Sequence, residues 1–167
     1  MKKLFLFAAA ILFLLCACEK KDDPDLGEFR DWESYIDMSQ KNMFDESLFW
    51  KEWAVDKVYR ETYVDGELRF KEDHTRDIIP WPNYVFRNDF TMAYGGWEGT
   101  WLYSHNYLIW QLPLVPIFSN AMEVQNVTSN SLTLKSEVYD PSSQKPFFKD
   151  KSGTHVFSIL ELKVISG

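Results

Sequence analysis

The side chains that could carry catalytic or metal chemistry are few and scattered. His74, His105 and His155 fall in a predicted loop, a turn and the start of a strand, where surface positions are expected, and no two of them have metal-ligand spacing. The sequence has no Gly-x-Ser-x-Gly motif to place a nucleophilic serine. A pair of carboxylates facing each other across a cleft stays open as a hydrolase site, because sequence does not show their separation. We expect a chain that is not an enzyme and has no metal site and no cofactor.

Aromatic residues are the feature that stands out, at 17% of the chain. Flat rings at the mouth of a β-barrel can bury an apolar ligand or stack on the face of a sugar. Rings can also simply fill a small barrel, which needs bulky side chains to leave no void, and this is the simpler interpretation. Trp101 and Tyr103 share one face of a predicted strand. The candidate ligand-binding residues are Trp81, Trp97, Trp101, Tyr103 and Trp110.

Short strands must position these rings. Asp65 and Gly66 favour the two positive φ angles of a tight hairpin, and Gly95 and Gly96 favour a tight turn or a bulge. Apolar and polar residues alternate most clearly from residue 131 to 139, so one face of that strand is expected to be buried. Residues 140–153 read as a long surface loop. Strands are expected at residues 58–64, 67–71, 84–86, 90–94, 100–103, 107–112, 122–127, 131–139 and 154–165.

Short strands separated by turn residues, with no long helix between them, predict an all-β antiparallel barrel or sandwich of about eight strands. A barrel is preferred, because closing the sheet removes its exposed edges. Before it, residues 29–52 form a lead-in segment in which Phe29, Trp32, Ile36 and Met43 lie roughly at helical spacing. Asp45 can cap a short turn there. A short helix, or an ordered lead-in that covers the barrel, is the expectation for this segment.

Four stretches resemble a known family: residues 84–91 (YVFRNDFT), 99–103 (GTWLY), 108–110 (LIW) and 131–134 (SLTL). Together with Trp53 as the first-strand tryptophan, they are similar in order and spacing to the lipocalin-like domains of many Gram-negative surface lipoproteins. The similarity spans about residues 48–165. It implies a lipocalin-like, calycin-type barrel over residues 53–167.

The N-terminus predicts lipidation. Lys2 and Lys3 precede a fifteen-residue apolar stretch that ends at Cys18, shorter than the about 20 residues of a membrane-spanning helix. Residues 15–18 (LCAC) resemble the lipobox of bacterial lipoproteins, with a small Ala17 before Cys18 as the expected acyl acceptor. Cys16 is the rival acceptor, but the bulky Leu15 precedes it. Residues 1–17 are then a signal peptide, and acyl chains on Cys18 anchor the protein to the membrane.

Residues 18–28 read as the lipidated cysteine and a polar tether. Its acidic residues Asp22, Asp23 and Asp25 either resemble the export tags of surface-exposed lipoproteins or only solvate the tether, and the sequence leaves both open. The expected location is the cell envelope, as an outer-membrane lipoprotein. A net charge of −7 excludes a generic nucleic-acid binder, whose affinity comes from clustered Lys and Arg.

Beside the hydrolase that an unrecognised carboxylate pair would make, two functions without catalysis remain from these observations. In the first, the barrel mouth binds a small apolar or glycan ligand without catalysis. In the second, the barrel is filled and an outer patch docks an envelope protein, so that the chain is an accessory subunit of a complex.

Overall fold

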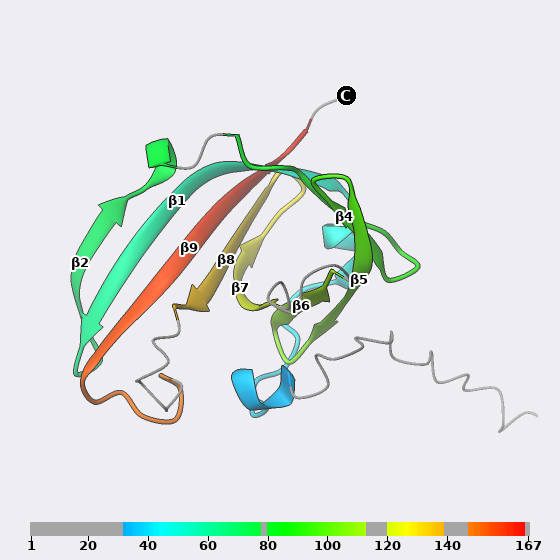
Figure 1. Ribbon diagram of the computed structural model, residues 1–167. Helices are drawn as coiled ribbons and strands as arrows, with labels where there is room; N and C mark the ends of the chain where they lie inside the picture. Colours follow the sequence, from blue (N-terminus) through cyan, green and yellow to red (C-terminus); the bar gives the residue numbers. More distant parts are fainter. Residues whose placement is uncertain (1–31, 78–79, 113–119, 139–146, 166–167) are drawn as a thin grey trace, which may run out of the picture.

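The computed structural model describes residues 32–77, 80–112, 120–138 and 147–165 (Figure 1). The predicted signal peptide, Cys18 and the tether lie outside these residues. The described strands are β1 (Glu52–Val64), β2 (Glu67–Asp73), β3 (Tyr84–Phe86), β4 (Thr91–Tyr94), β5 (Trp97–Ser104), β6 (Tyr107–Gln111), β7 (Asn120–Val127), β8 (Ser131–Glu137) and β9 (Thr154–Val164). The short 3₁₀ helices are η1 (Trp32–Tyr35), η2 (Glu46–Phe49) and η3 (Thr75–Asp77). Within the described ranges, no helix has the length and apolar character needed to cross a membrane.

The sheet closes on itself, which confirms the predicted all-β barrel. Each strand from β3 to β8 pairs antiparallel with the next, β9 pairs along the length of β1, and β1 pairs with β3 at Glu52 and Trp53. Strands β1 and β3–β9 therefore form a closed antiparallel barrel of eight strands. β2 pairs with the second half of β1, from Tyr59 to Val64, and flares away from the barrel with it (Figure 1).

Three hairpins turn through two residues that both have positive φ. These angles are 51° and 83° at Asp65 and Gly66, 58° and 85° at Gly95 and Gly96, and 51° and 66° at His105 and Asn106. This is the turn geometry that matches the right-handed twist of the flanking strands. The hairpin predicted at Asp65 is confirmed, and the glycine pair forms a tight turn rather than a bulge.

The core lies inside the barrel, and η2 covers one end of it. Phe49 of η2 and Trp53 of β1 are fully buried, and the Trp53 indole Nε1 donates to the carbonyl oxygen of Phe49 over 3.0 Å. Asp45 caps η2, as predicted, by accepting from the Ser47 amide. Other buried residues of this interior cluster include Phe86, Met92, Leu108, Val124, Leu132, Leu134 and Leu162.

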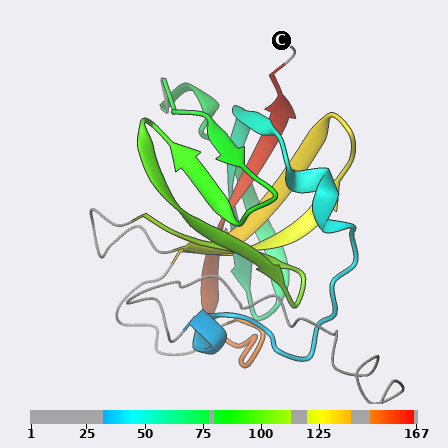
Figure 2. The ribbon, with the colours of Figure 1, turned by 90° about the vertical axis from the view of Figure 1, so that its right-hand side faces the viewer.

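The lead-in segment is the ordered cover rather than a single helix. Its described residues form only the two short helices η1 and η2, so the helical spacing does not define one buried face: Ile36 is buried, whereas Met43 is 72% exposed. Ile36 packs on the outside of the barrel against Leu102, Tyr107 and Ile109. The segment therefore covers both the outer wall and one end of the barrel (Figure 2).

Candidate ligand-binding site

A cavity of about 510 Å³ lies inside the barrel, at the end away from η2. The cavity forms beside the middle of β1. The pairing of β1 with β3 ends at Trp53, and further along the strand β1 contacts η3 instead. There the Val58 amide donates to Thr75 Oγ1 over 3.1 Å, and the His74 amide donates to the Val58 carbonyl over 2.9 Å. The cavity is lined by Val58, Tyr59, Arg60, His74, Asp77, Trp81, Tyr84, Tyr94, Trp110, Leu112, Asn120, Met122, Ser136, Ser158 and Leu160.

Small side chains in one cross-strand row explain why the interior is hollow at this level. Arg60 of β1 lies opposite Ser158 of β9, which lies opposite Ser136 of β8, and opposed residues share a face of the sheet. The adjacent interior row carries Val58, Leu160 and Leu134 in the same strands, and these bulky side chains are buried. Replacing a packed row by serines leaves volume that no side chain fills.

The cavity is apolar at depth and polar at its rim. Trp110, Leu112, Met122 and Leu160 are all buried and form its apolar wall. The rim carries the serine row and the side chain of Arg60, which is an exposed residue. This arrangement suits a ligand with an apolar body and a polar end.

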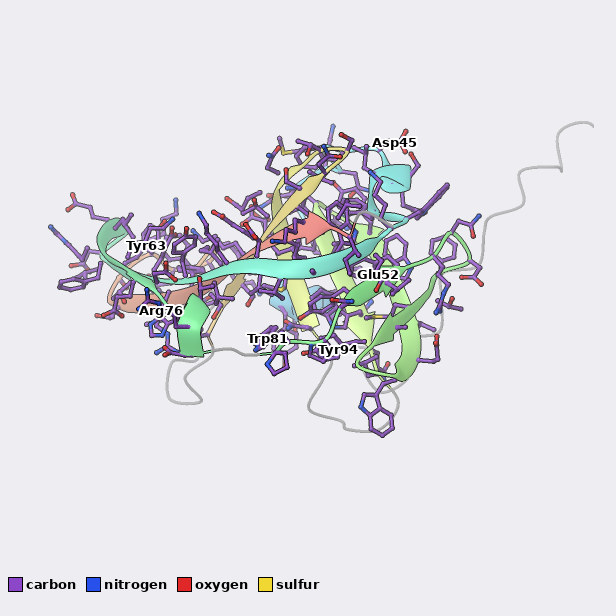
Figure 3. The ribbon with its side chains drawn as sticks, turned by 90° about the horizontal axis from the view of Figure 1, so that it is seen from above. Asp45, Glu52, Tyr63, Arg76, Trp81 and Tyr94 are labelled. Atoms are coloured by element: carbon purple, nitrogen blue, oxygen red, sulfur yellow. The ribbon has the colours of Figure 1, made fainter. Side chains whose placement is uncertain are left out.

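Tyr84 and Tyr94 form another wall, with ring centroids 4.7 Å apart. Burial raises the pKa of the Tyr84 hydroxyl and that of the Tyr94 hydroxyl, so both stay neutral. Trp81 lies on the same side of β1 as Tyr94 and is 37% exposed (Figure 3). Together these rings form an aromatic wall of the cavity, which is buried at Tyr84 and exposed to water at Trp81.

Of the five aromatic residues predicted to bind ligand, two line the cavity and three do not. Trp81 and Trp110 line the cavity together. Trp97, next to the Gly95 and Gly96 turn, is 51% exposed and does not line it. Trp101 and Tyr103 are buried on the same face of β5, as expected, but deeper in the core and outside the cavity lining.

Tyr103 has a clear structural role. Its hydroxyl oxygen accepts from the Met43 and Phe44 amides over 3.1 and 3.3 Å, and the hydroxyl donates to Asn106 Oδ1 over 2.8 Å. The Asn42 side chain also bonds the backbone of Tyr103 and Asn106. These bonds hold the lead-in segment against the barrel.

Sequence reasoning missed Arg60, His74, Asp77, Ser136 and Ser158, since only the strand register brings them to one cavity. A polar residue that breaks a run of alternating leucines, as Ser136 does after Leu132 and Leu134, is a signal that could have pointed to a hollow interior. The surface position predicted for His155 is wrong: this residue is 7% exposed and contacts Glu137. His74 Nδ1 lies 2.8 Å from Asp77 Oδ2.

The described residues contain no group of three or more His, Cys, Asp or Glu side chains placed to hold a metal ion. The resemblance to lipocalin-like lipoprotein domains stays a prediction from the sequence. No protein-family model, curated protein or solved structure matches this chain.

Proposed function

We propose that this protein is a lipid-anchored protein of the cell envelope that binds a small, mainly apolar ligand inside its barrel and does not catalyse a reaction. The observation that carries the proposal is the interior cavity, whose apolar wall of Trp110, Leu112, Met122 and Leu160 ends in a polar rim. Its volume of about 510 Å³ falls within the range of about 300–1,000 Å³ that is usual for small-molecule sites.

The anchoring half of the proposal rests on the sequence. Cys18 follows an apolar export signal and a small residue, as the lipid acceptor does in bacterial lipoproteins. Acyl chains there would hold the barrel at the outer membrane through the polar tether. An anchored binding protein samples apolar molecules in or near the bilayer, where such ligands are concentrated.

Intrinsic fluorescence tests the binding half, because Trp81 and Trp110 line the cavity. We expect saturable changes in tryptophan emission on titration with at least one of oleate, haem, cholate or maltotriose. Ser158→Phe puts a ring into the serine row of the cavity and should remove the response. The matched control is Thr154→Phe in the same strand, at an exposed position outside the lining, which should keep it. No response to any of the four in the wild-type protein would overturn the proposal.

A second function, docking of a protein partner, is favoured by one observation. On β2, Leu68 is 48% exposed and Phe70 is 65% exposed, and within the described residues this strand pairs with β1 alone. A strand with an open edge and exposed apolar side chains among its charged residues can accept a strand from another protein. Recovery of one stoichiometric partner from detergent-solubilised membranes, lost on Phe70→Lys, supports docking. Recovery of a monomer supports the binding protein.

A further inference from the structure

A second cavity, of about 700 Å³, lies on the outside of the barrel. One of its sides is the lead-in segment around η1, and the opposite side is the segment from Phe147 to Lys151 that precedes β9. Figures 1 and 2 show both segments at the same end of the barrel. Its floor is the outer face of the sheet, including Tyr107, Glu123 and Lys135, which lie opposite one another on β6, β7 and β8.

The lining of this outer cavity mixes hydrogen-bond donors, acceptors and rings. Asp37, Glu123 and Glu137 supply carboxylates, and Gln40 donates to Glu123 Oε1 over 3.1 Å. Burial foremost, and then the negative charges of these three carboxylates, raise the pKa of Tyr107 to about 12. Tyr35 adds a ring that is 47% exposed.

This chemistry selects a neutral polyhydroxyl group over a charged one. An anion such as a phosphate would face the three carboxylates, while Lys135 is already balanced by Glu61, 3.7 Å away. A cation would face Lys151, and one of the three carboxylates, Glu137, is already paired with His155. A sugar hydroxyl donates to carboxylates and accepts from ammonium or amide groups, and the C–H face of a sugar ring packs on an aromatic ring.

The wall on the β9 side is held firmly. The Phe147 amide donates to Glu137 Oε2 over 2.9 Å, and the Phe147 ring packs against Tyr63 and Phe157 with centroid distances of 5.5 and 5.0 Å. His155 binds Glu137 through Nδ1 and the Ser152 carbonyl oxygen through Nε2. This wall of the cavity is therefore held in place before a ligand binds, which favours specific binding.

The inner and outer cavities are neighbours. Asn120 and Ser136 line both of them. The pairing of β7 with β8 ends at Glu123 and Lys135, so the first residues of β7 and the last residues of β8 separate at this rim. An apolar cavity inside the barrel thus adjoins a polar, ring-lined cavity outside it.

We propose that one ligand occupies both cavities and that it is a glycolipid, with its hydrocarbon chain inside the barrel and its sugar head in the outer cavity. The proposal rests on the proposed function, since the chain needs the inner cavity. It adds the ligand class: a single-chain lipid with a neutral sugar head is preferred over a free fatty acid or a phospholipid.

Alkyl ligands with the same chain and different heads test this, below their micelle concentrations. We expect dodecyl maltoside to bind at least about tenfold more tightly than dodecanoate or dodecylphosphocholine, the gain from one or two added hydrogen bonds. Glu123→Gln and Tyr35→Ala should each weaken dodecyl maltoside about tenfold and leave dodecanoate unchanged. Glu67→Gln, an exposed carboxylate on β2 outside both linings, is the control and should change neither.

The outcomes separate the two proposals. If dodecanoate binds as tightly as dodecyl maltoside, or if the outer-cavity variants weaken both equally, the glycolipid assignment is wrong while the inner site stands. If none of the three binds, the glycolipid assignment fails, and the titration with oleate, haem, cholate and maltotriose decides whether the proposed function stands. Ser158→Phe should weaken dodecyl maltoside and dodecanoate alike, and unchanged binding of both would place the chain outside the barrel and overturn the glycolipid assignment.

Discussion

His155 Nδ1 lies 2.5 Å from Glu137 Oε1 on the neighbouring strand, and both side chains are largely buried although they lie on the outer face of the sheet. His155 Nε2 lies 3.0 Å from the carbonyl oxygen of Ser152. Both ring nitrogens therefore face acceptors, and only the charged imidazolium can donate to both. This pair ties the segment before β9 to β8 and fixes one wall of the outer cavity.

The His155 pair predicts a pH-dependent contribution to stability. Burial opposes the charged form, but the hydrogen bonds to Glu137 and Ser152 and the negative charges of Glu137 and Asp150 outweigh it, so the pKa of His155 is raised. A raised pKa contributes stability that is complete below about pH 6.5, the usual histidine value, and is lost as the pH rises through the folded-state pKa. NMR titration of the imidazole should give a pKa above 6.5 in the protein and a lower one in Glu137→Gln. A pKa at or below the usual value in the wild-type protein would contradict this.

Gly99 is predicted to be required for the approach of β5 to the end of β6. A Cβ at this position would lie 2.1 Å from the carbonyl oxygen of Gln111 and 2.9 Å from Leu112 Cδ2. Because the first neighbour is backbone, the strands must separate, and Gly99→Ala should destabilise the protein by about 1–3 kcal/mol or more. Urea unfolding measures this. Gly96→Asn is the comparison and should cost much less, since a Cβ at Gly96 would meet no atom within 4 Å and asparagine tolerates positive φ.

Removing the Tyr103 hydroxyl should loosen the lead-in segment. Tyr103→Phe leaves the Met43 and Phe44 amides and Asn106 Oδ1 without this partner, at an expected cost of about 1–3 kcal/mol. Hydrogen exchange should speed up at the Met43 and Phe44 amides while amides in β8 and β9 stay protected. Uniform acceleration across the barrel would mean that Tyr103 acts on global stability rather than on this segment.

Lipidation at Cys18 predicts opposite results for the two cysteines. Cys18→Ser should abolish incorporation of a labelled fatty acid and leave the uncleaved precursor, because the acceptor thiol is gone. Cys16→Ser should keep both labelling and cleavage. Labelling that survives in Cys18→Ser and disappears in Cys16→Ser would move the acceptor to the earlier cysteine.

The local elements could be predicted from the sequence because short-range chemistry determines them. The chain turns at Asp65 and Gly66, and again at Gly95 and Gly96, because these residues favour positive φ. The alternation of apolar and polar residues after Ser131 produces a strand with one buried face. The residue pattern predicted β1 only from residue 58, and only the family resemblance placed Trp53 on this strand, because pairing with β3 and β9 rather than local pattern decides its first half.

The cavities could not be predicted, since their residues meet only through strand register. Arg60, Ser158 and Ser136 are far apart in sequence and form one row only when β1, β9 and β8 pair in their observed alignment. The same holds for the buried contact of His155 with Glu137. Rings such as Trp101 and Trp110 have the same chemistry, and only their depth in the barrel separates a core residue from a cavity wall.

The location of a bound chain tests the central claim most directly. With ¹³C-labelled dodecyl maltoside, or with oleate if the maltoside does not bind, intermolecular NOEs should connect the alkyl chain to the methyl groups of Leu112, Met122 and Leu160 inside the barrel. We expect these NOEs in the wild-type protein and their loss in Ser158→Phe. A bound chain whose NOEs reach only surface residues such as Leu68, with none to the interior methyl groups, would contradict it.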